Sequence, residues 1–145
     1  MSLFLESLQE LMIENELNIV SFAKRIDRNK SAVRRWLYGN YYPEPSTLIK
    51  ISKTFNISID YLFGLSDNKN IFPVNNNGTF YERYTTLKSA SNFSDYYVAK
   101  TCNLRTSTIA KWKKIQNIPE TATLLELVKC FSCSLDYLLG LTKYK

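Results

Sequence analysis

The chain contains one internal repeat, in which the second copy follows the first at a spacing of 76 residues. Aligned without a gap, residues 4–65 and 80–141 are identical at 19 of 62 positions. A period this long with only two copies does not fit a solenoid, so each copy should be a small domain of its own. We therefore predict an N-terminal domain at residues 1–66, a linker at 67–79 and a C-terminal domain at 80–145.

The predicted linker is polar and rich in asparagine, with Asn68, Asn70 and Asn75–Asn77. Its apolar stretch, Ile71–Val74, should pack on one of the two domains. Domains of about 65 residues bury only roughly 60% of the surface of their unfolded chain, so each requires tight helical packing.

The net charge of +6 favours an anionic partner. In the first copy the basic and acidic residues lie in different stretches. The basic residues gather at Lys24, Arg25, Arg28, Lys30, Arg34 and Arg35, whereas most acidic residues are Glu6, Glu10, Glu14 and Glu16. This separation predicts a domain with one basic side, although a solvated helix face is the simpler alternative.

The residue types exclude most catalytic and metal-binding sites. The chain has three cysteines and no histidine. Cys130 and Cys133 have the spacing of metal ligands, but a structural zinc site needs four ligands. Cys102 and Cys133 align with Ile26 and Ile57, so we expect packing roles, with a redox role as the alternative. No nucleophile and base occur together, and we expect no enzyme, cofactor or metal.

No stretch approaches the roughly 18 apolar residues of a membrane-spanning helix. No signal peptide is evident at Met1, and a cytoplasmic protein without membrane contact is the expectation.

Helical periodicity and capping residues predict five short helices in the first copy. Asn18 and Ser58 should cap the second and fifth helices, and Asn29 the third. Gly39 should end the third helix in a conformation of positive φ. The expected helices are residues 3–14, Asn18 to Ile26, Lys30 to Tyr38, Pro43 to Phe55, and the turn after Ser58. The short break between the second and third helices is typical of a helix-turn-helix.

Two groups of aromatic residues lie near the third helix. Trp36 and its counterpart Trp112 fall on the apolar side by periodicity and should be buried. Tyr38, Tyr41 and Tyr42 follow the same helix. They should pack on the fourth helix, or else contact DNA or a partner domain.

Several motifs together resemble the Cro/lambda-repressor class of helix-turn-helix domain, the XRE family. They are Leu17-x-x-x-x-Phe22-Ala23-Lys24-x-Ile26, then Ser31-x-Val33-x-Arg35-Trp36-x-x-Gly39, and the ending Asp60-Tyr61-Leu62-x-Gly64. The repeat extends the resemblance to residues 80–141. It implies an all-α protein with two tandem five-helix lambda-repressor-like domains joined by a polar linker.

The resemblance also implies that the third helix enters the major groove of double-stranded DNA. Lys30, Ser31 and Arg34 would then face bases. The candidate DNA-binding residues of the first copy are Asn18, Arg28, Asn29, Lys30, Ser31, Arg34, Arg35, Tyr38 and Asn40. Ile19 departs from the family, which often has a glutamine at this position.

The second copy differs from the first in its third helix. Thr106 and Ala110 stand where the first copy has Lys30 and Arg34. The candidate DNA-binding residues of the second copy are Arg105, Thr106, Ser107, Lys111, Lys113 and Lys114. The second copy could read a different half-site, or it could serve in backbone binding, dimerisation or protein recognition.

From these features we expect a sequence-specific transcriptional regulator, in particular a repressor. The alternative is a phage or mobile-element protein that binds another protein, as antitoxins and inhibitors of host defence do. In that case the C-terminal domain would bind the protein partner. A homodimer is compatible with either function.

Overall fold

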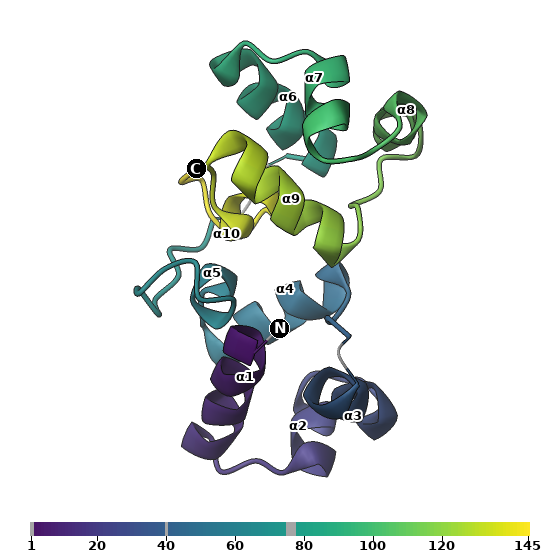
Figure 1. Ribbon diagram of the computed structural model, residues 1–145. Coiled ribbons are helices and arrows are strands. Elements are labelled where there is room, and N and C mark those ends of the chain that lie inside the picture. Colours follow the sequence, from purple (N-terminus) through teal and green to yellow (C-terminus); the bar gives the residue numbers. More distant parts are fainter. Residues whose placement is uncertain (1, 40, 75–77) are drawn as a thin grey trace. The chain divides into compact units, whose positions relative to one another are not determined.

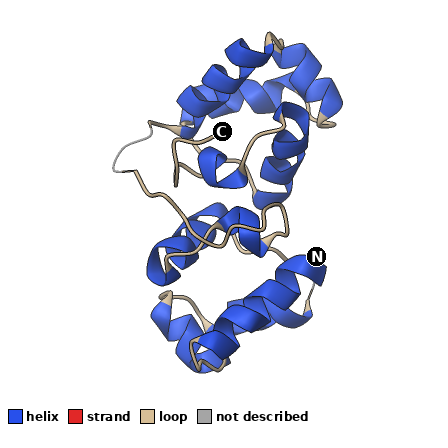
Figure 2. Cartoon of the chain, turned by 90° about the vertical axis from the view of Figure 1, so that its left-hand side faces the viewer, coloured by secondary structure: helices blue, strands red, loops and turns tan. Residues whose placement is uncertain are grey.

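The computed structural model (Figure 1) describes residues 2–39, 41–74 and 78–145. Within these ranges the chain forms α-helices and loops, and no strand occurs (Figure 2). It divides into two compact units, Met1–Ile71 and Phe72–Lys145.

The first unit contains five helices, in agreement with the sequence prediction. They are α1 (Ser2–Glu14), α2 (Ile19–Arg25), α3 (Lys30–Tyr38), α4 (Pro45–Phe55) and α5 (Ile59–Leu62). Asn18 and Ser58 cap α2 and α5 as predicted, each accepting a hydrogen bond from a backbone N–H three residues later. Such caps satisfy N–H groups that have no partner within the helix.

Two expectations about the ends of α3 are wrong. Asn29 precedes the helix, but its side chain makes no capping hydrogen bond. Gly39 ends the helix with a φ of −113°, not in the left-handed conformation. A Cβ atom at this position would lie 3.0 Å from the carbonyl oxygen of Arg35. Close packing, rather than a positive φ, therefore explains the glycine.

The core of the first unit is apolar and tightly packed. Its completely buried residues include Leu8, Phe22, Ile26, Val33, Leu48, Ile51, Ile59 and Leu62. Trp36 is buried on α3, as predicted. Phe22 of α2 stacks on Phe55 of α4, with ring centroids 5.5 Å apart. This ring contact joins α2 to α4, and α3 packs on α2.

The three tyrosines at the end of α3 and just after it do not form one cluster. Tyr42 contacts Phe4 of α1 and Phe63 after α5, at ring-centroid distances of 6.0 and 5.2 Å. Tyr38 and Tyr41 are exposed, at 76% and 61%. The ring contacts of Tyr42 are thus with α1 and Phe63 instead of the predicted α4, and the side chains of Tyr38 and Tyr41 are accessible to a partner.

The second unit has the same order of helices. They are α6 (Phe80–Ser91), α7 (Asp95–Thr101), α8 (Thr106–Ile115), α9 (Thr121–Phe131) and α10 (Leu135–Leu138). Positive-φ residues recur at the repeat spacing, as the pairs Glu16 and Asn92, Asp27 and Asn103, Asn56 and Ser132, and Gly64 and Gly140. The two units thus share their turns as well as their helices.

The structural repeat extends past the aligned sequences. The backbone N–H of Ser58 donates to the carbonyl oxygen of Lys69 at 3.0 Å. In the second unit, Ser134 donates to Lys145 at 2.7 Å. Lys69 also forms an ion pair with Glu14 of α1. Part of the predicted linker therefore folds back on the first unit, whereas its residues Asn75–Asn77 lie outside the described residues.

The second unit has its own core, which includes the completely buried residues Tyr84, Val98, Leu124, Leu127, Leu135 and Leu138. Trp112, Cys102 and Cys133 are buried as well, in agreement with the prediction. Phe72, in the apolar stretch of the predicted linker, is exposed at 59%. Its ring meets the edge of Tyr144 within the second unit, at a centroid distance of 6.1 Å.

Candidate nucleic-acid interface

Helix α3 has two chemically different faces. Val33, Trp36 and Leu37 are buried against the rest of the first unit. The opposite face is exposed and contains the candidate residues Lys30, Ser31, Arg34, Arg35 and Tyr38. Packing of the apolar face thus turns three basic side chains toward solvent from one short helix.

The turn before α3 positions an arginine. Asp27 adopts a φ of +56°, and the backbone N–H of Arg28 donates to the carbonyl oxygen of Ala23 at 2.9 Å. The Arg28 Nε atom donates to Thr47 Oγ1 of α4, also at 2.9 Å, and Nη1 donates to the carbonyl oxygen of Asp27. The guanidinium group is therefore oriented before any ligand binds.

A hollow of about 230 Å³ lies between the turn, α3 and the start of α4. Arg28, Arg35 and Tyr41 contribute to its wall, together with Glu44 and Thr47. Two arginines beside one hollow are suited to an anion such as a DNA phosphate. Sequence patterns alone do not reveal this arrangement, because Tyr41 and Thr47 reach the arginines only through the tertiary fold.

The remaining candidates of the first unit lie at the ends of α2 and α3. Asn18 is exposed at the start of α2, and its side chain is held by Ser21. Asn29 is exposed directly before α3. Asn40 lies outside the described residues. Apart from Asn40, the structure places all candidates of the first unit on α3, in the preceding turn or at the start of α2.

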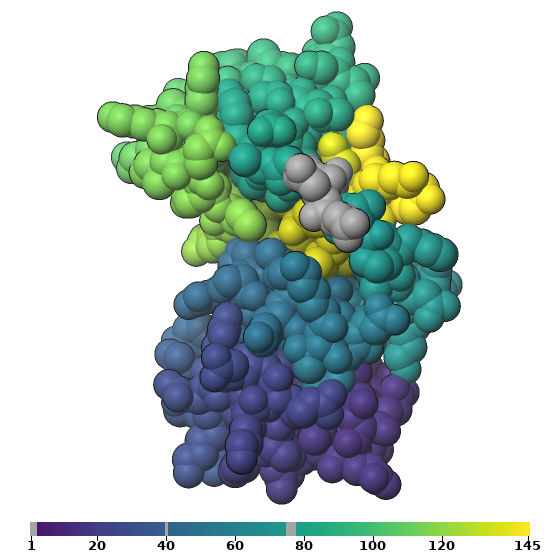
Figure 3. Space-filling view, turned by 180° about the vertical axis from the view of Figure 1, so that it is seen from behind, coloured from purple at the N-terminus to yellow at the C-terminus, as the bar shows by residue number. Residues whose placement is uncertain are grey.

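The corresponding helix of the second unit, α8, has a different surface. Ile109 and Trp112 are its buried residues. All six candidates are exposed: Arg105, Thr106, Ser107, Lys111, Lys113 and Lys114. In a space-filling view from the opposite side, the green side chains of α8 project from the second unit (Figure 3). The positive charge lies before the first turn and in the second half of α8.

An acidic residue accompanies the start of α7 in the second unit. Asp95 occupies the position of Ile19 and accepts hydrogen bonds from Lys88 and Tyr84, both at 2.7 Å. Partial burial alone would raise the pKa of Asp95, but these hydrogen bonds outweigh it, so that the pKa lies below its ordinary value. The ion pair with Lys88 thus replaces the apolar side chain that the first unit has at this position.

Two cysteines of the second unit, Cys102 and Cys130, have raised pKa values. Burial raises the pKa of the Cys102 thiol to about 12, and the charge of the neighbouring Cys130 contributes. Burial also raises the pKa of Cys130. Since the thiolate is the reactive form, these values disfavour a redox role. Among the described residues, no three His, Cys, Asp or Glu side chains lie together as metal ligands would.

Comparison with known proteins supports a DNA-binding role for the first unit. Residues 8–62 match a protein family described as Helix-turn-helix. These residues form one XRE-type helix-turn-helix, a type of domain that typically binds DNA and is not enzymatic. The comparison with curated proteins found no significant match, and neither did the comparison with solved structures. In the described part of the chain, no helix has the length and apolarity needed to cross a membrane.

Proposed function

We propose that this protein is a sequence-specific regulator of transcription, in particular a repressor, that inserts α3 into the major groove of double-stranded DNA. The main support is the two-sided character of α3 within residues that match the helix-turn-helix family. Its buried face fixes the helix on the domain. Lys30, Ser31 and Arg34 then have side chains that can bind the edges of bases.

The residues around α3 fit contacts with the DNA backbone. Arg28 is already oriented by Thr47 and stands beside Arg35. Charge-assisted hydrogen bonds from arginine to phosphate position a protein on DNA without selecting a sequence. In this proposal α3 reads bases, while Arg28, Arg35 and the start of α2 set its orientation.

The second unit is a second helix-turn-helix domain in this proposal, and it contributes mainly backbone contacts. Its helix order and positive-φ positions repeat those of the first unit. On α8, however, Thr106 and Ala110 replace the long basic residues Lys30 and Arg34 of the first unit. Lys111, Lys113 and Lys114 can bind phosphates as point charges, and two linked domains bind more tightly than either alone.

Selection of binding sites from a random DNA library tests this proposal. The wild-type chain should enrich a defined sequence. Arg34→Ala should weaken binding to that sequence at least tenfold, which is about 1.4 kcal/mol. Lys53→Ala, which removes an exposed charge from α4, is the matched control and should leave the selected sequence unchanged. Equal binding to all sequences, or no binding at low salt, would contradict the proposal.

A protein-binding inhibitor, as phages and mobile elements encode, is the second candidate function. It is favoured by the surface of α7, where Tyr96 and Tyr97 are exposed at 67% and 47%. Aromatic side chains are enriched at protein interfaces. If Tyr96→Ala and Tyr97→Ala abolished binding of a stoichiometric host protein, with DNA affinity unchanged, this function would be supported.

A further inference from the structure

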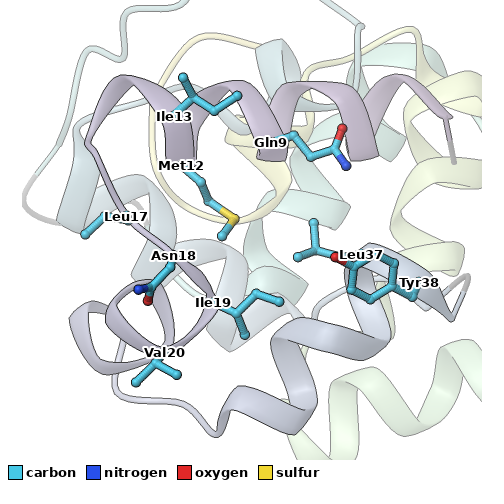
Figure 4. A pocket seen from close by; sticks show the side chains of 9 residues that line it. All are labelled: Gln9, Met12, Ile13, Leu17, Asn18, Ile19, Val20, Leu37 and Tyr38. Carbon is cyan, nitrogen blue, oxygen red and sulfur yellow. The ribbon is translucent and has the colours of Figure 1, made fainter.

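The first unit has an exposed apolar hollow of about 530 Å³ between α1, the start of α2 and the end of α3. Figure 4 shows Met12, Ile19 and Leu37, one from each helix, directed toward the space between these helices. Ile13, Val20 and Tyr38 stand at its edge and are exposed at 76%, 58% and 76%. An accessible apolar surface of this kind is typical of an interaction site.

A second hollow of about 330 Å³ continues this surface along α1. The two hollows share Gln9 and Ile13, and the second extends to Leu3, which is exposed at 58%. Ten residues of helix separate Leu3 from Ile13, which corresponds to about 15 Å. We call the two hollows together the α1 groove. Its length suits about three turns of a partner helix laid in the groove.

The α1 groove has acidic residues at its edge. Glu6 and Glu10 line the second hollow, and both are exposed. Helix α1 contains no lysine or arginine. Among the described residues, Lys69 forms an ion pair with Glu14, while Glu6 and Glu10 form none. Glu10 also interacts with the charge of Lys69 and helps to raise the pKa of that amine. The groove therefore presents carboxylates beside apolar side chains, on a protein whose net charge is +6.

The second unit is an internal comparison, because the same fold has other residues at most of these positions. Met12, Ile13 and Ile19 correspond to Lys88, Ser89 and Asp95. Leu37 and Tyr38 correspond to Lys113 and Lys114, and Glu10 corresponds to Thr86. The fold therefore does not require an apolar and acidic surface at this place. Of the remaining positions, Glu6 recurs as Glu82, and Val20 is replaced by Tyr96, which is also exposed.

The charges decide between occupants. Two copies of the chain that paired through α1 would bring the carboxylates of Glu6 and Glu10 close to those of the other copy, and like charges repel. A basic partner would instead gain favourable interactions with them. We propose that the α1 groove binds an amphipathic helix of a partner protein, with lysine or arginine residues bordering its apolar face. This proposal goes beyond DNA binding and does not depend on it.

A pair of synthetic helical peptides tests the proposal on the full-length chain. One has leucine on its apolar face and lysine elsewhere, and the other has glutamate in place of lysine. Peptide is titrated into the ¹⁵N-labelled protein, and backbone amide shifts locate the site. We expect the lysine peptide to bind at least tenfold more tightly, with shifts at α1, Val20 and Tyr38. Tighter binding of the lysine peptide could not be explained by a general attraction between opposite charges, because the protein as a whole is positively charged.

Matched variants show whether the groove is responsible. Ile13→Ser and Glu10→Thr each introduce the residue that the second unit has at the corresponding position. Each substitution should lower the affinity for the lysine peptide at least fivefold. Ile115→Ser makes the same change at an exposed isoleucine of α8 and should have no effect. Equal affinity for both peptides, shifts confined to the second unit, or no binding at millimolar peptide would overturn the proposal. Self-association that Ile13→Ser abolishes would overturn it in favour of a second copy.

Discussion

The hydroxyl group of Tyr84 donates a hydrogen bond of 2.7 Å to the carboxylate of Asp95, which joins α6 to the start of α7. Lys88 Nζ donates to the same oxygen atom at 2.7 Å. The first unit has Leu8, Met12 and Ile19 at the three corresponding positions. The same place in the repeated fold is thus a polar network in one unit and an apolar surface in the other.

The Tyr84–Asp95 bond predicts a pH dependence of the second unit. Because the pKa of Asp95 is lowered in the folded state, its stabilisation is complete above the unfolded value of about 3.9 and is lost as pH falls through the folded pKa. Asp95→Asn should lower the free energy of unfolding of the second unit by about 1 kcal/mol at pH 7 and by less below pH 3. Thermal unfolding followed by the indole NMR signals of Trp36 and Trp112 reports on the two units separately. An equal cost at pH 7 and pH 2.5 would contradict this prediction.

The hydrogen bond from Arg28 to Thr47 should contribute to DNA affinity by orienting the guanidinium group. Arg28→Ala should weaken binding about tenfold for every DNA sequence, because a phosphate contact does not read bases. Thr47→Val should weaken binding two- to fourfold. In the second unit, Thr123 corresponds to Thr47, but the residue at the position of Arg28 is Leu104. Thr123→Val is therefore the matched control and should leave the DNA affinity unchanged. Fluorescence anisotropy with labelled DNA measures these affinities, and an altered sequence preference in Arg28→Ala would refute the assignment.

The lysines at the end of α8 should contribute to affinity and salt dependence without affecting sequence preference. Each phosphate contact contributes a slope of about −0.9 to the plot of log K against log salt concentration. Replacing Lys113 and Lys114 by alanine should therefore reduce the slope by about 1.8. Lys129→Ala on α9 is the control. If the slope does not change, α8 does not lie on DNA, and the protein-binding alternative gains support.

Arg83 should stabilise the second unit. It is buried, with 5% of its surface exposed. Its Nε and Nη2 atoms donate to the carbonyl oxygen of Leu138 at the end of α10. Methionine in Arg83→Met fills a similar volume but leaves this carbonyl without these donors. The substitution should therefore lower the free energy of unfolding of the second unit by about 1–3 kcal/mol. The melting temperature reported by Trp112 should fall while that reported by Trp36 stays constant. A change in both would mean that the effect is not local.

The sequence predicted the helices closely because their limits depend on local interactions. Asn18 and Ser58 cap α2 and α5 through backbone groups three residues away. The exposed face of α3 follows from helical periodicity, since Val33, Trp36 and Leu37 fall on the other side. For the same reason, the location of Lys30, Ser31 and Arg34 on one accessible helix could be predicted. Their contact with DNA stays a prediction.

Contacts between distant parts of the chain could not be predicted in this way. The place of Tyr42 depends on Phe4, 38 residues earlier in the sequence, and on Phe63, 21 residues later. Likewise, Arg28 gains its orientation from a threonine 19 residues later. Sequence patterns within a helix contain no information about which side chains of other helices lie close by.

The sequence by itself determined that the chain folds twice into five helices, since the repeated positions are mostly those of core, caps and turns. Only the tertiary structure decided what each unit presents at its surface. The α1 groove exists because three helices bring Met12, Ile19 and Leu37 together, whereas the same packing in the second unit brings together Lys88 and Asp95. Packing of a common backbone thus turns scattered substitutions into two chemically different surfaces.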